Sequence, residues 1–360
     1  MAEAKSIETL SVLFTAGVVA GTLVSGPFSR ALPALLLPLL VLPILLRRRM
    51  ARLPEKQAVA MILPLFLLLG VFCALLADVP GVHGEGWLRS RALASGAALR
   101  AFIDTLPFPD ARTAPLLKAL LTGDRSGLSA DTVALFRESG ASHLLALSGL
   151  HVGIIYLLLD KAGSVLGASP LARKLRFAAV VAASGWFTLM TGASPSIVRA
   201  FLFILINEVL RLTLRPRRPL RVLCLALLIQ LVLDPSVVRS TGFQLSYLAM
   251  AGIFLLYPRL ESWYPAGSRW NPLRRLWQSA ALAISCQLFT APLAWLRFHS
   301  FPRYFLLTNL LAIPLTTGLM VCALATLGLW ALGACPALLI TATDGLGRLL
   351  LSVLEVIATL

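Results

Sequence analysis

The chain has 360 residues, of which 58% are hydrophobic and 13% are charged, and its mean hydropathy is +0.85. Soluble domains carry about 25% charged residues, so this composition excludes a soluble protein. A membrane-spanning helix needs about 20 apolar residues, and the sequence contains about ten runs of that kind. We therefore predict an all-α, polytopic protein in the lipid bilayer, with about ten transmembrane helices, some of them broken or re-entrant.

The formal net charge is +16, from 32 lysine and arginine residues against 16 acidic residues. A basic excess can attract a polyanion, or it can hold loops on the cytoplasmic side of a membrane. Most of these basic residues fall in alternate loops of the predicted topology, so net charge alone is weak evidence for a nucleic acid. The five cysteines are scattered singly, which favours small core residues over a disulfide framework or a zinc site.

Residues 1–77 are predicted to form an N-terminal three-helix membrane segment, with apolar runs near 10–28, 31–46 and 58–77. The second run ends in a basic cluster, Arg47 to Arg52, which the positive-inside rule places in the cytoplasm. The N-terminus is then cytoplasmic, and residues 78–140 form an extracytoplasmic loop.

The extracytoplasmic loop is predicted to contain amphipathic helices. Residues 86–104 place apolar and arginine side chains with a period near 3.6, which predicts a helix on the membrane surface. A second helix near 111–121 is expected to stop at a structural turn formed by Gly123, Asp124 and Arg125. A short third helix follows that turn.

Residues 141–360 are predicted to form the main transmembrane domain. Its expected membrane runs lie near 141–159, 177–191, 196–214, 220–233, 242–257, 277–295, 304–332 and 338–360. Pro314 lies inside the seventh run, and an internal proline predicts a broken or doubled helix there.

The first of these runs contains a polar cluster in apolar surroundings. On an ideal helix His143, His151 and Ser148 fall at roughly 0°, 80° and 140°, on one broad polar face, unless Gly149 breaks the helix. These residues either line a pore or form hydrogen bonds between helices, because polar groups in a bilayer avoid lipid. A zinc site would need a third ligand, and a Ser148 nucleophile would need an acid to orient His151. The sequence shows neither.

A second polar cluster centres on Arg199. Ser196, Arg199, Phe203 and Asn207 fall within roughly 80° on one helix. Burial of an arginine is costly unless the charge is paired or hydrated. Its partner is expected to be a phosphate or one of three carboxylates, those of Asp124, Asp234 and Glu208.

Two later segments add polar groups. Gln244 and Tyr247 share one face of a helix, and Asn309 precedes Pro314 by five residues. Amides and hydroxyls with few fixed charges suit a polyanion that must enter and also leave. The candidate pore-lining residues are His143, Ser148, Gly149, His151, Ser196, Arg199, Asn207, Gln244, Tyr247 and Asn309.

Five polar blocks follow one another along the chain, namely Leu120 to Ser129, Phe136 to His151, Thr191 to Ala200, Asp234 to Ser246 and Asn309 to Leu315. Together they resemble the ordered signature blocks of the ComEC-type competence membrane domain. The resemblance covers about residues 88–332. It implies a competence-type transmembrane channel domain over 141–360, in the bacterial cytoplasmic (inner) membrane, that passes single-stranded DNA during natural transformation.

The resemblance also implies that the candidate pore residues lie along the DNA path. The partners that it implies are single-stranded DNA, an extracytoplasmic DNA receptor and a cytoplasmic helicase-like motor, and it allows a homodimer.

Members of that family often carry an oligonucleotide-binding-type domain and a metallo-β-lactamase-like domain, for which this sequence shows no room or signature. With four histidines and no clustered metal-binding signature, we expect no metal, no cofactor and no nuclease activity. The sequence also has no phosphate-binding loop, so the chain is not expected to power transport by nucleotide hydrolysis. We expect a channel and not an enzyme. Two other functions stay open: a secondary transporter of a small anion with Arg199 at its site, and an intramembrane hydrolase that uses Ser148 and His151.

Overall fold

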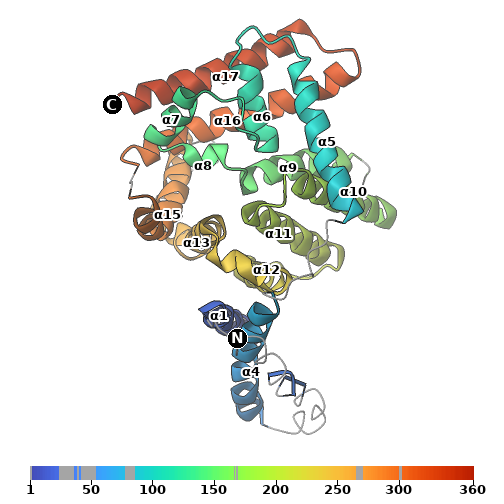
Figure 1. Cartoon of the computed structure of the whole chain (residues 1–360), viewed down its shortest axis with the longest axis vertical. Coiled ribbons are helices and arrows are strands. Elements are labelled where there is room, and N and C mark those ends of the chain that lie inside the picture. Colours follow the sequence, from blue (N-terminus) through green and yellow to red (C-terminus); the bar gives the residue numbers. More distant parts are fainter. Residues whose placement is uncertain are drawn as a thin grey trace. The chain divides into compact units, whose positions relative to one another are not determined.

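The computed structural model describes residues 2–23, 36–38, 40–41, 54–77, 86–165, 167, 169–264, 271–299 and 302–360. Over these ranges every regular element is a helix and there is no strand (Figure 1). The predicted all-α class is therefore confirmed for the described residues. The chain divides into two compact units, one of residues 1–85 and 205–244 and the other of residues 86–204 and 245–360.

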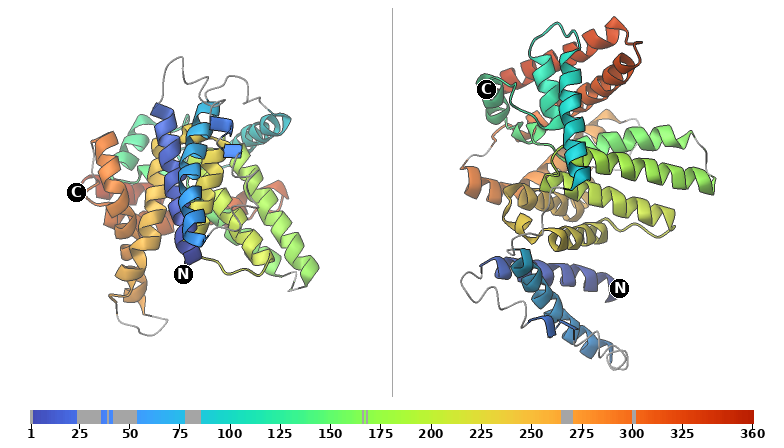
Figure 2. Two further views of the ribbon diagram at one scale, coloured as in Figure 1. Left: turned by 90° about the horizontal axis from the view of Figure 1, so that it is seen from below. Right: turned by 45° about the vertical axis from the view of Figure 1, so that its right-hand side comes forward.

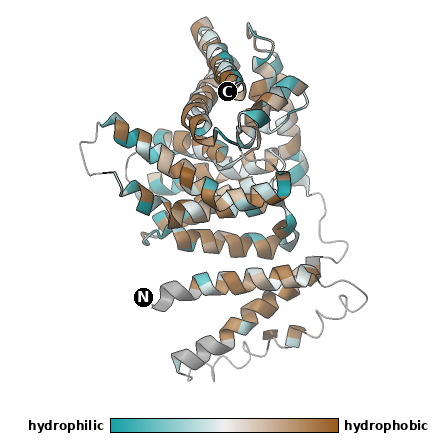
Figure 3. Cartoon of the chain, turned by 90° about the vertical axis from the view of Figure 1, so that its left-hand side faces the viewer, coloured by the Kyte–Doolittle hydropathy of each residue, from teal (hydrophilic) through white to brown (hydrophobic). Residues whose placement is uncertain are grey.

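Three helices are long and apolar enough to cross a membrane, namely α15 (Pro272–Phe298), α16 (Phe305–Ala331) and α17 (Ala337–Ala358). Shorter apolar helices cover Ile7–Leu23, Ile62–Leu76, Pro219–Leu233 and Thr241–Leu255. Hydrophobic residues predominate along many of the helices (Figure 3). These features support a membrane protein, whereas the larger number of about ten spans stays a prediction.

The first unit contains α1 (Ala2–Leu23), α4 (Glu55–Ala77), α12 (Pro219–Leu233) and the short 3-10 helix η2 (Pro235–Arg239). Glycines bring α1 and α4 together, because a Cβ atom at Gly17 would overlap the carbonyl of Leu67 and one at Gly70 would overlap the carbonyl of Phe14. Close backbone contact at small residues is typical of helix pairs in membranes. Most of the run predicted at 31–46 lies outside the described residues.

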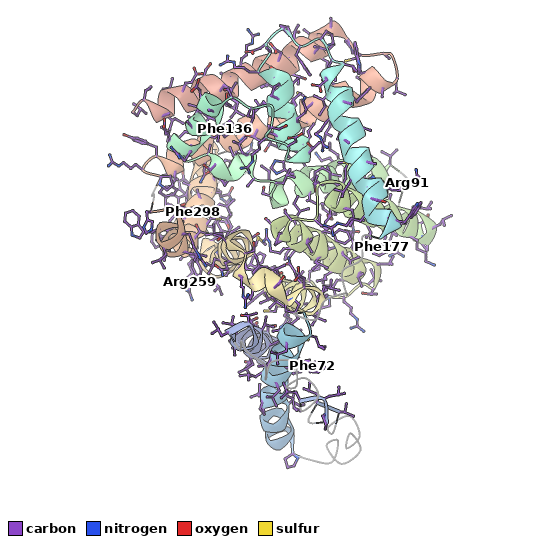
Figure 4. All side chains as sticks on the ribbon, viewed as in Figure 1. Phe72, Arg91, Phe136, Phe177, Arg259 and Phe298 are labelled. Atoms are coloured by element: carbon purple, nitrogen blue, oxygen red, sulfur yellow. The ribbon has the colours of Figure 1, made fainter. Side chains whose placement is uncertain are left out.

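The second unit contains most of the remaining helices, namely α5 (Trp87–Asp104), α6 (Thr113–Thr122), α7 (Ala130–Glu138), α8 (Ser142–Leu145), α9 (Gly149–Ser164), α10 (Pro170–Met190), α14 (Tyr257–Glu261), α15, α16 and α17. It also includes the first part of α11 (Pro195–Leu212) and most of α13 (Thr241–Leu255). Its largest core joins α6, α7, α16 and α17 around the buried side chains of Leu120, Phe136, Met320 and Leu350; Phe136 is labelled in Figure 4. α9 and α10 lie side by side (Figure 2).

α5 confirms the helix predicted over 86–104. Gly96 and Ile103 are buried on one face, whereas Trp87 at the start of the helix is 71% exposed. Gly96 allows a close approach to α10, since a Cβ atom there would lie 2.8 Å from Met190 O. One face of α5 therefore packs on protein, and its location at a membrane surface stays a prediction.

The helix break predicted at Pro314 is wrong, because α16 continues through Pro314 from Phe305 to Ala331. A proline removes one N–H donor, and membrane-type helices tolerate this when nearby groups satisfy the backbone. α15 likewise contains an internal proline without interruption.

The predicted segments 1–77, 78–140 and 141–360 are defined by the side of the membrane on which they lie. Contacts between helices do not test such a division, so these boundaries stay predictions. The compact units are instead defined by which residues pack together. Residues 205–244 pack with the N-terminal helices, although in sequence they come directly after residue 204 of the second unit.

Candidate functional site

The helical segment predicted at 141–159 breaks between α8 and α9, and α9 starts at Gly149. Ser148 has an extended backbone, with φ −132° and ψ 177°, and its Oγ accepts a hydrogen bond from Leu150 N at 3.3 Å. His151 Nδ1 accepts a hydrogen bond from Ser148 N at 3.2 Å, which completes a capping box. The break that Gly149 was expected to allow is therefore confirmed, and the single polar face of a continuous helix does not form, because the break separates His143 from Ser148 and His151.

A turn after α6 holds this break. Arg125 donates from Nε and Nη2 to Leu145 O at 3.1 and 2.9 Å, so it caps the carboxyl end of α8. Gly123 ends α6 with a φ of 77°, in the left-handed region that favours glycine. Leu147 packs against it, since a Cβ atom on Gly123 would lie 2.5 Å from Leu147 Cδ1. The turn and the break thus form one interlocked structure.

Asp124 anchors the same turn to α5. Its Oδ1 accepts a hydrogen bond from Ser126 N at 3.0 Å, and its Oδ2 lies 3.2 Å from Arg100 Nε. Hydrogen bonds from Ser126, and secondarily the charge of Arg100, hold the pKa of the Asp124 carboxyl below its ordinary value. Asp124 is therefore an ionised structural anchor near neutral pH.

Several predicted residues come together where α9, α11 and α13 meet. Ser196 Oγ on α11 lies 3.0 Å from Ser246 Oγ on α13. The Arg199 guanidinium lies over the Tyr247 ring, with Cζ 5.9 Å from the ring centroid. A Cβ atom on Gly149 would lie 3.5 Å from Arg199 Nη2, so the first turn of α9 adjoins the guanidinium. These five residues are the Arg199 cluster.

Arg199 is 8% exposed, and its Nε has no hydrogen-bond partner among the described residues. The carboxylates predicted as its partners are engaged elsewhere: Asp124 with Arg100 at 3.2 Å, Glu208 with Arg211 at 3.4 Å and Asp234 with the Ser236 amide at 3.1 Å. None of the ion pairs found in the described ranges includes Arg199. The Tyr247 ring offers it a cation–π contact, and no carboxylate of the described residues pairs with its charge.

The remaining candidate residues lie outside the Arg199 cluster. Gln244 Nε2 donates to Val238 O at 2.7 Å within the first unit. Asn207 lies on the part of α11 that belongs to the first unit. Asn309 lies on α16, and its buried Oδ1 has no partner in the part of the chain described. His143 Nδ1 lies 3.2 Å from the carbonyl three residues earlier. Their assignment to a pore stays a prediction.

Ser148 and His151 have the spacing of a nucleophile and a base, with Oγ 3.2 Å from Nδ1. The same nitrogen accepts the Ser148 amide, so helix capping explains the contact. His151 is fully buried, and its Nε2, where an orienting acid would bind, has no partner within the described ranges. The arrangement therefore serves to start α9.

Asp344 is a structurally important residue that the sequence analysis did not identify. Asp344, on α17, is fully buried, and its Oδ1 accepts hydrogen bonds from Asp110 N at 3.0 Å and Thr113 Oγ1 at 2.7 Å. Its Oδ2 lies 3.1 Å from Arg348 Nε. It ties α17 to the start of α6, where a helix dipole favours negative charge. An acidic residue inside an apolar run was the available signal.

Comparison with known proteins identifies relatives of limited overlap. The chain is 27% identical over 218 residues to ComE operon protein 3 of Bacillus subtilis. This alignment covers 60% of the present chain and 26% of that protein. It is 27% identical over 219 residues to Recombination protein 2 of Haemophilus influenzae. That alignment covers 57% of the present chain and 27% of the relative. It is also 26% identical over 201 residues to an uncharacterised protein of Escherichia coli, with 54% and 26% coverage.

The chain thus matches about a quarter of the length of each of these relatives, and no solved structure matches it significantly. A family model described as Competence protein matches residues 120–360. That range begins at the first of the five polar blocks and covers more than half of the chain. The resemblance seen in the sequence is confirmed, and the chain belongs to the competence protein family.

Proposed function

We propose that the chain is a channel for passage of single-stranded DNA across the bacterial cytoplasmic membrane during natural transformation. Membership of the competence protein family supports this role, as do the names of two relatives, ComE operon protein 3 and Recombination protein 2. The observation that carries the proposal is Arg199, a buried arginine that adjoins the start of α9 and forms no ion pair with the described residues. Such a charge needs an anion, and a DNA strand supplies one with every nucleotide.

The composition of the Arg199 cluster suits a polyanion in transit. It presents one fixed positive charge, the hydroxyl groups of two serines, and the aromatic ring and hydroxyl group of one tyrosine. A conducting site must bind its ligand strongly enough to admit it and weakly enough to release it. A single arginine with neutral polar neighbours meets both conditions, whereas several fixed cations in a row would hold the strand.

The proposed channel is a multi-pass protein of about ten transmembrane helices with its N-terminus in the cytoplasm. Further spans would come from the shorter apolar helices and from α9, α10 and α11. In this proposal the channel is not an enzyme, and it would not power transport itself, because the sequence has no phosphate-binding loop to couple nucleotide hydrolysis to transport. An extracytoplasmic receptor would then deliver the strand and a cytoplasmic motor would pull it, and the channel would work alone or as a homodimer.

The test is entry of labelled DNA into cells of the native host that lack the gene and carry it again on a plasmid. We expect deletion to leave DNA on the cell surface and to abolish entry of DNase-resistant label. Arg199→Ala should reduce entry by about tenfold or more, since a charge-assisted contact contributes about 1.5–3 kcal/mol. Arg137→Ala, an exposed arginine on α7, is the control and should leave entry unchanged at matched membrane levels.

Normal entry in the deletion strain would contradict the proposal. The charge of Arg199, which no described carboxylate balances, also favours a second candidate, a secondary transporter of a small anion. Uptake of labelled inorganic phosphate by vesicles that contain the purified protein separates the two: phosphate uptake abolished by Arg199→Ala, with normal DNA entry, would assign the protein to anion transport.

A further inference from the structure

We infer that the first turn of α9 and the Arg199 guanidinium together bind one phosphodiester group of a single-stranded DNA. This inference rests on the proposed function and specifies where that function would engage its substrate. It follows from the position of Gly149, from the burial of Arg199 and from the absence of a carboxylate partner within the described residues.

The start of α9 offers one backbone donor to a ligand, the amide of Gly149. The first amides of a helix have no acceptor within the helix, and the helix dipole places partial positive charge there. The Leu150 amide is occupied by Ser148 Oγ, and the His151 amide by Ser148 O at 3.2 Å. Gly149 is the first residue of the helix and has no side chain to cover its amide. A phosphate oxygen at a helix start of this kind is a common mode of anion binding.

Arg199 supplies the full charge. Its Nη2 lies 3.5 Å from the position that a Gly149 Cβ atom would occupy, so the guanidinium is directed to the first turn of α9. Only 8% of the residue is exposed, and its Nε has no partner among the described residues. The Tyr247 ring holds one face of the guanidinium and leaves the N–H groups at its edge for an anion, in the planar geometry that suits phosphate.

A lipid phosphate offers the same chemistry, but it lies at the membrane surface, whereas Arg199 is more than nine-tenths buried. A DNA strand that passes through the protein would reach a buried arginine without leaving the protein interior. A phosphodiester carries a single negative charge, which one arginine and a helix start can balance. The strand is therefore the ligand that this geometry favours.

The experiment measures binding of a fluorescent oligothymidylate to the full chain in phosphatidylcholine nanodiscs, over a range of salt concentrations. One phosphate contact contributes about 0.7 to the slope of log affinity against log salt for a single strand. We expect Arg199→Gln to reduce the slope by about 0.7 and to weaken binding by about tenfold. Arg199→Lys should keep the slope and lose a few-fold in affinity, and Arg137→Gln should change neither.

An oligothymidylate with an uncharged methylphosphonate backbone provides the matched ligand, and its weak binding should be the same for wild type and Arg199→Gln. If the glutamine variant is not recovered folded, protection of Arg199 in the wild type against phenylglyoxal takes its place. The charged oligothymidylate should protect Arg199 and the methylphosphonate strand should not.

The inference is overturned if Arg199→Gln keeps the wild-type slope while the wild type binds and admits DNA, a result that leaves the proposed function standing. It is also overturned if phosphatidylglycerol in the discs, or inorganic phosphate, protects Arg199 and the oligothymidylate does not. Failure of the proposed function gives a different result, namely no binding of either strand by the wild type together with normal DNA entry in the deletion strain.

Discussion

The guanidinium of Arg125 donates two hydrogen bonds to the carbonyl of Leu145, from Nε at 3.1 Å and from Nη2 at 2.9 Å. Leu145 is the last residue of α8. The last carbonyls of a helix receive no hydrogen bond from an N–H group of the same helix. Arg125 belongs to a turn 20 residues earlier in the chain. On the other side of the break, Ser148 caps the amino-terminal end of α9. Polar contacts therefore stabilise both the end of α8 and the start of α9.

Arg125→Gln should destabilise the break. The substitution removes two charge-assisted hydrogen bonds from a partly exposed site, and we expect it to lower the free energy of unfolding by about 0.5–1.5 kcal/mol. The measurement is unfolding in mixed detergent micelles by titration with dodecyl sulfate. Arg137→Gln makes the same chemical change on an exposed arginine of α7 and should stay within about 0.5 kcal/mol of wild type. Equal stability of all three proteins would contradict a role for Arg125 as a cap.

Gly123→Ala should be destabilising for two separate reasons. Its φ of 77° is unfavourable for alanine by about 1–2 kcal/mol, and the new methyl group would lie 2.5 Å from Leu147 Cδ1. Combining it with Leu147→Ala should remove the overlap and leave the backbone strain. Gly127→Ala is the control, since its Cβ atom would lie 3.4 Å from Pro115 and fits. A stability of Gly123→Ala equal to that of Gly127→Ala would show that the turn tolerates a side chain.

Asp344→Ala should loosen α17 from the start of α6. The change leaves the Asp110 amide and the Thr113 hydroxyl without their acceptor, and we expect a loss of about 2–3 kcal/mol in unfolding free energy. Asp344→Asn keeps one oxygen acceptor and should lose about half as much. Glu138→Ala, at an exposed position of α7, serves as the control in the same titration. A full loss with asparagine would indicate that the charge, and not the acceptor, stabilises the contact.

Ser148→Ala distinguishes a channel from a hydrolase. The hydroxyl caps α9, and its removal should destabilise the protein by about 1 kcal/mol and reduce entry of DNase-resistant DNA only in part. Ser148→Thr retains a capping hydroxyl and should restore most of the loss. A serine nucleophile would respond differently, because alanine would abolish all activity at normal membrane levels. Complete loss of function in Ser148→Ala, with threonine also inactive, would favour the hydrolase.

The sequence by itself determined the all-α class and the positions of most helices, because the length of an apolar run and the residues at its ends act over a few neighbouring positions. Ser129, for example, caps α7 through Thr132 N at 3.2 Å, and residues 86–104 contain the predicted helix α5. The five ordered blocks likewise sufficed for the resemblance that the family model confirms.

The tertiary structure decided where the helix breaks and which polar groups meet. Gly149 and Pro314 were both local signals for a break, yet only the first one breaks a helix. The break before Gly149 is held by Arg125 from a turn 20 residues before Leu145, whereas α16 continues through Pro314. Ser196 meets Ser246 across 50 residues, and Asp344 meets Thr113 across 231. Helical periodicity relates residues three or four positions apart, so contacts between distant helices, and the lack of a carboxylate beside Arg199 in the described chain, are properties of the packing alone.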